Sequence, residues 1–203
     1  MTPAIILLNG PKRSGKDTAA SAMVRGSVGW IIKPLAEELK RETLAYHGFD
    51  VGMLDTFDAK KDEPLDAFMG LTWRDLVIDH SDVTRAAWGA DHWASLWAAR
   101  VRDIFAMDIP VVIMPDCRFQ AELDVALSIT PHVLLARIYR TAKAQHEPDA
   151  WAGDIGSWLF PPVADVPQVA LFNDGRKEDF EWEATSAAFH FVKSVNRRAA
   201  AAL

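Results

Sequence analysis

The stretch IILLNGPKRSGKDT, residues 5–18, decides the fold of this 203-residue chain. Its first part is an unbroken apolar run, which is typical of a strand buried on both faces of a parallel sheet. The run leads directly into the spacing G-x-x-x-x-G-K, and a helical pattern follows at residues 16–25. A strand, a glycine-rich turn and a helix in this order predict a loop that binds phosphate groups.

Each residue type in this loop has a physical reason. The glycines let the backbone curl so that successive N–H groups point at phosphate oxygens, and the helix dipole adds positive potential there. Lys16 is expected to reach the β- and γ-phosphates of ATP, and Mg²⁺ would be held by Asp17, Thr18 or a water. Asp17 stands where a hydroxyl residue usually follows the lysine. The residues expected to bind the nucleotide are Gly10, Lys12, Arg13, Ser14, Gly15, Lys16, Asp17 and Thr18.

Strands and helices alternate along the rest of the chain. Further strands are expected at 110–114, 133–138 and 169–172, with a short apolar stretch at 30–32. Helices are expected at 34–48, at 72–106 with breaks near 79–81 and 89–90, at 118–127 and at 177–198, whereas 50–70 reads as irregular. This order predicts a single α/β domain, a P-loop NTPase-type three-layer α/β/α fold with a parallel sheet of about five strands. Residues 34–107 would form a helical insertion that binds the acceptor, and residues 141–167 a lid-like loop.

A second acidic position follows the strand at 110–114. Ligands of open α/β sheets bind outside the carboxyl ends of the strands, so Asp116 is expected beside the phosphate loop. Its carboxylate could orient metal-bound water or accept a proton, and Arg118 could neutralise phosphate charge from the same turn. Asp116 would equally serve as the N-cap of the next helix.

Composition excludes several classes of function. The net charge of −6 argues against stable nucleic-acid binding, because nucleic-acid-binding proteins usually carry a basic face. No apolar stretch approaches the ~18 residues of a membrane span, and the apolar start lacks the basic region and cleavage site of a signal peptide. The single cysteine, Cys117, fits a reducing, cytoplasmic setting, and the six histidines show no metal-ligand spacing. A homodimer through helix 91–107 is a further possibility.

Together these motifs resemble the deoxynucleoside monophosphate kinases of large bacteriophages. Matching segments occur in order: G-K-D-T at 15–18, K-P-L at 33–35, K-D-E-P at 61–64, T-x-R-x-L at 72–76, R-x-x-x-G-x-D-x-W at 85–93, D-x-R-F-x-x-E at 116–122 and N-D-G at 173–175. The family's lid usually carries a His-x-Ser-Glu motif, whereas residues 155–160 here read IGSWLF. Such kinases bind ATP and Mg²⁺, and a phage origin would place the protein in the host cytoplasm.

The resemblance implies roles for further residues. Arg137 and Arg140 would lie at the lid, facing the ATP phosphates, and would join Lys16, Asp116 and Arg118 in catalysis. Asn173 would contact the nucleotide. The residues expected around the acceptor are Lys33, Arg74, Arg85, Trp88, Trp93, Arg118 and Glu122. Trp73, Trp88 and Trp93 could stack on the acceptor base, although core packing is the favoured interpretation for them.

The resemblance leaves other functions open. The acceptor could be a modified nucleotide or phosphomevalonate, because the animal phosphomevalonate kinase has a comparable loop and an Asp-x-Arg after an inner strand. A P-loop switch that hydrolyses NTP and a non-catalytic binding module are alternatives from other classes. The chain shows no Asn-Lys-x-Asp guanine-reading motif and no motor-type strand, and retention of Lys16, Thr18 and Asp116 argues against a decayed site.

Overall fold

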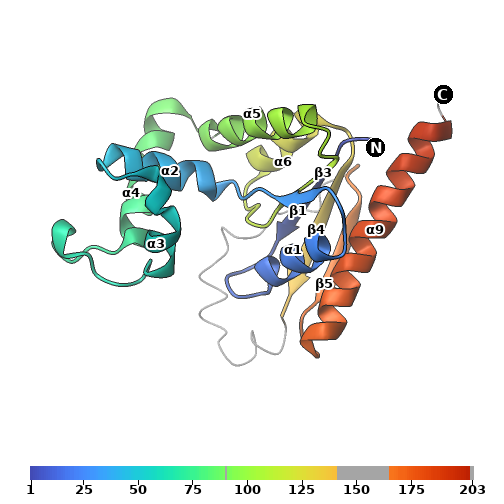
Figure 1. The fold of residues 1–203 in the computed structure, drawn as a ribbon, viewed down its shortest axis with the longest axis horizontal. Helices are drawn as coiled ribbons and strands as arrows, with labels where there is room; N and C mark the ends of the chain where they lie inside the picture. Colours follow the sequence, from blue (N-terminus) through green and yellow to red (C-terminus); the bar gives the residue numbers. More distant parts are fainter. Residues whose placement is uncertain (90, 141–164, 202–203) are drawn as a thin grey trace. The chain divides into compact units, whose positions relative to one another are not determined.

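A parallel β-sheet forms the centre of the fold in the computed structural model, which describes residues 1–89, 91–140 and 165–201 (Figure 1). Its strands are β1 (Ala4–Asn9), β2 (Trp30–Ile32), β3 (Val111–Met114), β4 (Val133–Tyr139) and β5 (Gln168–Phe172). Within the described residues they lie in the order β2-β3-β1-β4-β5, with every neighbouring pair parallel. The apolar run that precedes the phosphate loop is therefore the central strand, and all of its residues are buried.

Helices cover both faces of this sheet. Helices α1 (Lys16–Arg25) and α9 (Lys177–Ala201) pack on one face, where Ile6, Met23 and Ala188 belong to one apolar core. The β1–β2 and β3–β4 connections run in opposite directions across the sheet, so right-handed crossovers place α6 (Gln120–Ile129) on the face opposite α1. The prediction of a three-layer α/β fold is confirmed.

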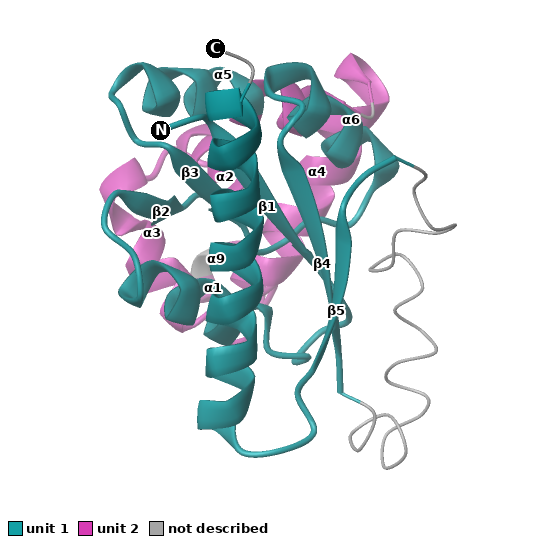
Figure 2. Cartoon of the chain, turned by 90° about the vertical axis from the view of Figure 1, so that its right-hand side faces the viewer, with its two compact units in different colours: residues 1–34, 98–203 teal, residues 35–97 magenta. Residues whose placement is uncertain are grey.

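The chain divides into two compact units, which Figure 2 colours separately. Unit 1 comprises residues 1–34 and 98–203 and contains the whole sheet. Unit 2 comprises residues 35–97, a narrower range than the insertion expected at 34–107. It contains α2 (Ala36–Tyr46), α3 (Leu54–Ala59), α4 (Trp73–Trp88) and the start of α5 (His92–Ala106), with short 3-10 turns at Val51–Met53 and Asp66–Phe68. Its own core includes Leu44, Phe57, Trp73 and Leu76.

Two local predictions for unit 2 are wrong. The segment 50–70, expected to be irregular, contains α3, whose Phe57 anchors the core of the unit. No break occurs near 79–81, because α4 is continuous from Trp73 to Trp88. A capping box at Thr72 and Asp75 starts this helix, and burial of Ser81 and Thr84 supports its middle despite polar residues of low helix propensity. The predicted end at Gly89 is confirmed, with φ 104° there.

The expected lid falls largely outside the described residues. Of residues 141–167, the structure describes only the last three. The carbonyl of Pro167 accepts a hydrogen bond from the Leu135 amide at 3.0 Å, at the start of the β4–β5 pairing. None of the described helices is long and apolar enough to cross a membrane.

Candidate functional site

The loop after β1 can adopt its backbone conformation only because two of its residues are glycines. Gly10 has φ 154°, and a Cβ atom there would lie 2.5 Å from the backbone oxygen of Ile138. Gly15 has φ 111°, and its Cβ would lie 2.4 Å from the Asn173 amide nitrogen. Arg13, between them, also takes a positive φ of 63°. The two glycines are therefore required by close backbone approach, as the phosphate-loop prediction expects.

Lys16 begins α1 and turns its side chain back over the loop. Its Nζ donates hydrogen bonds to the carbonyl oxygens of Gly10 and Pro11, at 2.6 and 2.8 Å. The ammonium group is thereby held against the loop backbone at the positive end of the helix, away from the apolar core. A phosphate oxygen placed there would meet both the cation and the helix N-terminus.

A polar pocket of about 240 Å³ opens at this loop. Its described lining residues are Arg13, Gly15, Lys16, Asp17, Thr18, Arg140 and Asn173. Asn173 donates to the Ser14 carbonyl at 2.8 Å, and Arg140 donates to the Arg13 carbonyl at 3.4 Å. Arg140 and Asn173, which only the family resemblance assigned to the nucleotide, thus lie next to the phosphate loop. Lys12 is exposed, and Ser14 is fully buried inside the loop.

The loop after β3 is fastened to the end of β1. Fully buried Asn9, the last residue of β1, donates its side-chain amide to the Cys117 carbonyl at 2.9 Å. The neighbouring strands β1 and β3 send their following helices to opposite faces, so their carboxyl ends form the switch point of the sheet. Asp116, partly buried, therefore lies in the turn tied to the strand that carries the phosphate loop.

Glu122 makes hydrogen bonds within its own turn, and its expected contact with the acceptor stays a prediction. Its carboxylate accepts hydrogen bonds from the backbone amides of Arg118 and Phe119, at 2.5 and 3.1 Å, and the residue is buried. Glu122 thus caps the N-terminus of α6, which begins at Gln120 and not at residue 118 as predicted. The side chain of Arg118, two residues after Asp116, is exposed.

Arg137 also departs from its expected position at a lid. It lies within β4, in register with Asn9 of β1, and its Nε donates to the Gln168 side chain of β5 at 3.1 Å. Lys33 directly follows β2, and its backbone amide donates to the Ile113 carbonyl at 2.8 Å, which extends the pairing of β2 with β3.

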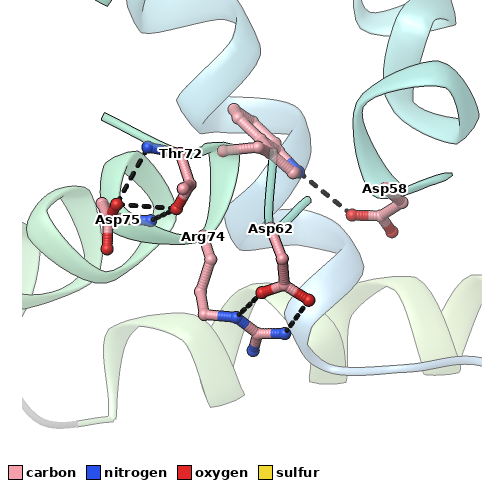
Figure 3. A network of polar contacts seen from close by, with 6 residues as sticks. Asp58, Asp62, Thr72, Arg74 and Asp75 are labelled. Atoms are coloured by element: carbon pink, nitrogen blue, oxygen red, sulfur yellow. Dashed lines mark hydrogen bonds and ion pairs between the residues drawn. The ribbon is translucent and has the colours of Figure 1, made fainter. Parts of the chain in front are cut away.

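The other expected acceptor residues belong to unit 2. Arg74 makes a two-point ion pair with Asp62, with nitrogen–oxygen distances of 2.7 and 3.2 Å (Figure 3). This contact raises the pKa of the guanidinium. Arg85 is partly buried near the end of α4.

The tryptophan side chains of unit 2 differ in their exposure to solvent. Trp73 and Trp93 are buried, as the core-packing interpretation expects, and the Trp73 indole donates to Asp58 at 3.0 Å. Trp93, assigned to the acceptor, is 1% exposed and presents no face on which a base could stack. Trp88 is 73% exposed, so core packing is wrong for this residue.

Sequence reasoning missed Asn9 and Asp62. For Asn9 a signal was present, because a polar residue that closes a fully apolar strand must find a buried partner. Asp62 was noted only as part of the K-D-E-P segment at 61–64, and no local signal indicated its pairing with Arg74, which lies twelve residues away across a turn. Among the described residues no group of three or more His, Cys, Asp or Glu side chains could hold a metal ion.

The Asn9–Cys117 contact leads to a test of the switch point. Asn9→Ala removes the donor to a buried carbonyl, which costs about 1–3 kcal/mol. Burial and the nearby charges of Glu122 and Asp116 raise the pKa of the Cys117 thiol well above its usual value, so the native thiol should resist maleimide at pH 8. We expect Asn9→Ala to speed labelling of Cys117 by about tenfold.

The matched control for this test is Asn196→Ala. Asn196, on α9, also uses its side-chain amide to hold the backbone of unit 1, but its oxygen accepts a hydrogen bond from the Thr2 amide at 3.1 Å and not from the turn that contains Cys117. It should leave the labelling rate unchanged. Equal labelling rates for Asn9→Ala and the wild-type chain would show that this hydrogen bond does not hold the turn.

Comparisons with known proteins agree with this architecture. No protein-family model and no curated protein matches the chain. A solved sugar kinase from Janibacter sp. HTCC2649 has a TM-score of 0.55 at 16% identity, over 92% of this chain and 94% of that one. A gluconokinase from Sinorhizobium meliloti 1021 has a TM-score of 0.52 at 14% identity, over 97% of both chains. At such identities the likeness concerns the fold, and the chain shares the three-layer α/β architecture of these structures.

Proposed function

We propose that the chain is an ATP-dependent kinase that transfers the γ-phosphoryl group of ATP to a small anionic acceptor. The pocket at the phosphate loop carries this proposal. Among its described lining residues, Arg13, Lys16 and Arg140 are cationic and only Asp17 is acidic. Three cations, a helix N-terminus and inward N–H groups are what a triphosphate requires. The kinase names of the two similar solved structures support the same class of reaction.

The residues present fit Mg·ATP. A Cβ atom at Gly10 would clash with the Ile138 carbonyl oxygen and one at Gly15 with the Asn173 amide, so only glycine allows the curled loop backbone that a phosphate can approach. Thr18 and Asp17 line the same pocket and offer the oxygen ligands that Mg²⁺ prefers, with Asp116 in the neighbouring turn. Bound Mg²⁺ would neutralise charge on the β- and γ-phosphates.

Phosphoryl transfer requires positioning more than covalent chemistry. An acceptor oxygen forms a bond to the γ-phosphorus while the bond from that phosphorus to the β,γ-bridging oxygen breaks and ADP leaves. Lys16, Arg13 and Arg140 would stabilise the charge that spreads over the transferring group. A monophosphate acceptor is ionised at neutral pH, so its attack needs no strong general base.

We assign the acceptor as a deoxynucleoside monophosphate. The assignment rests on the ordered motifs of the sequence and on the cations Lys33, Arg74, Arg85 and Arg118, which suit a phosphate-bearing acceptor better than a neutral one. A second candidate, a sugar or sugar acid, is favoured by the names of the two solved structures with this fold. Attack by its hydroxyl would require a proton acceptor, a role that Asp116 could fill.

An ADP-release assay with Mg·ATP distinguishes these candidates. The acceptor panel comprises deoxy- and ribonucleoside monophosphates, phosphomevalonate, gluconate and hexoses, with a reaction that lacks acceptor as the control. ADP release that depends on one or a few deoxynucleotides supports the assignment. ADP release that depends on gluconate or a hexose would identify a sugar as the acceptor in place of a deoxynucleotide. ADP release without any acceptor would indicate an NTP hydrolase.

The Arg74–Asp62 ion pair provides a prediction about acceptor binding. If Arg74 binds the acceptor phosphate, Asp62 competes for the same guanidinium. Arg74→Ala should raise the KM for the acceptor by about tenfold or more, since a charge-assisted hydrogen bond is lost. Asp62→Ala frees the guanidinium and should lower that KM by about two- to fivefold, because a partly exposed ion pair contributes little.

Glu37→Ala is the matched control, because it frees Arg41 on α2 from a similar ion pair of 3.0 Å. It should leave the KM unchanged. A KM that rises in Asp62→Ala as it does in Arg74→Ala would mean that the ion pair only maintains the structure of unit 2.

A further inference from the structure

The outer face of α9 carries large apolar side chains that a solvated helix face rarely has. Its inner face, with Phe180, Ala184, Ala188, Val192 and Val195, packs into unit 1. On the outer side, Trp182 is 71% exposed and Phe189 is 46% exposed. These two residues are seven positions apart, which is two helical turns, so they project from the same side. Figure 2 shows α9 in front of the sheet.

A groove of about 740 Å³ adjoins the C-terminal half of this outer face. Apolar side chains form most of its described lining, including Val28, which is 94% exposed, Trp30 and Phe189. Asn196 and Ala200 continue the line of Trp182 and Phe189 along the helix and also line the groove. Trp30 begins β2, so the groove lies at the amino end of the strands, opposite the edge that carries the phosphate loop.

The outer face is complementary to itself. Trp182 lies seven residues before Phe189, and Asn196, in the groove, lies seven residues after it. The groove begins at Phe189 and runs toward Ala200. At a rise of 1.5 Å per residue, Trp182 and Asn196, which lies in the groove, are about 10 Å on either side of Phe189 along the helix. A two-fold axis through Phe189 therefore places each Trp182 over the groove of the other copy, which is the self-matching patch of an isologous interface.

From this geometry we propose that two copies of the chain form a dimer through antiparallel α9 helices. Trp182 of each copy inserts into the groove of the other, and the two Phe189 side chains meet at the axis.

The charges of the helix favour this arrangement. The charged residues among the described lining of the groove are Lys193 and Arg197, both cations. In the antiparallel pair they meet the indole of Trp182, a contact that cations and aromatic faces stabilise. Glu178 then lies opposite Ala200, one turn from Arg197 of the other copy. A parallel pair would place cations against cations and align the two helix dipoles unfavourably.

Sedimentation and light scattering across about 1–200 μM chain measure the association. We expect a dimer that Trp182→Glu converts to monomer with unchanged circular dichroism and melting behaviour. Phe189→Glu should also give monomer but should lower the melting temperature, because it removes the contact of the Phe189 ring with Trp30, whose ring centroids lie 5.3 Å apart. Glu183→Lys, a charge change on a different exposed side of α9, is the control and should remain dimeric. A wild-type chain that stays monomeric throughout this range overturns the proposal and leaves the groove to another occupant.

Cysteine crosslinking tests the register independently of stability. Helices packed 8–10 Å apart bring two residues at the axis to about the Cα separation of a disulfide. Phe189→Cys should form a crosslinked dimer on mild oxidation, and His190→Cys, exposed on another side of the helix, should not. The native Cys117 is buried and contributes no background. A dimer that crosslinks through position 190 and not through 189 contradicts the proposed axis.

Discussion

Lys16→Ala is expected to reduce phosphoryl transfer by about 10²–10³-fold while leaving the melting temperature unchanged. The Lys16 side chain contacts the carbonyl oxygens of Gly10 and Pro11 and lines the pocket, and it contributes nothing to the apolar core of unit 1. Its removal therefore takes a cation from the transferring phosphoryl group without opening a cavity. Steady-state kinetics with saturating acceptor, together with a thermal melt, measure both quantities.

Lys177→Ala is the control for this experiment. Lys177 begins α9, where its exposed ammonium lies 3.6 Å from Glu181, and a surface ion pair of this kind contributes little to stability. Its activity should equal that of the wild-type chain. A Lys16→Ala variant with full activity would contradict the assignment of the phosphate site, and one that unfolds would show that the loop carbonyls depend on the ammonium.

Gly10→Ala should have the largest effect on stability. The new methyl group would lie 2.5 Å from the Ile138 carbonyl oxygen, and φ 154° is unfavourable for any L-residue with a side chain. Because Ile138 belongs to β4, the clashing atom is a backbone oxygen that the sheet holds in place, and it cannot move as the end of a side chain could. We expect a loss of about 3 kcal/mol, near 10 °C in Tm, and loss of nucleotide binding.

Two other glycines separate the sources of this effect. Gly175→Ala meets no atom within 4 Å and should change Tm little. Gly70→Ala also meets no atom within 4 Å but has φ 86°, so it measures backbone strain without a clash. Gly10→Ala should exceed both losses. If Gly10→Ala lowers Tm no more than Gly70→Ala does, the loop after β1 can shift to accommodate the methyl group, and its close approach to β4 is not required.

Local sequence patterns predicted the secondary structure elements that depend mainly on residues close together in the chain. The five strands follow from continuous apolar runs, and the phosphate loop follows from glycines at a fixed spacing. In unit 2 the same reasoning failed at 79–81, because tertiary burial of Ser81 and an N-terminal capping box outweigh low helix propensity.

Contacts between distant residues were harder to predict. Asp116 was expected near the phosphate loop from the topology alone, but the Asn9–Cys117 bond that fastens its turn joins residues 108 positions apart. Glu122 shows that one motif can serve two purposes, since its family motif predicts an acceptor contact while its position three residues after Phe119 is that of a capping box. A short polar motif does not reveal which of its members face inward.

The central position of β1 has a consequence for how the chain is made. Strand β1 lies between β3 and β4, whose residues follow it by more than a hundred positions. The loop after it is completed only by Asn173, which donates to the Ser14 carbonyl across 159 positions. Contacts of such high sequence separation slow folding. Strand β1 therefore stays unpaired during synthesis until β3 and β4 have been made, and the phosphate loop is completed only when Asn173, after β5, docks against it.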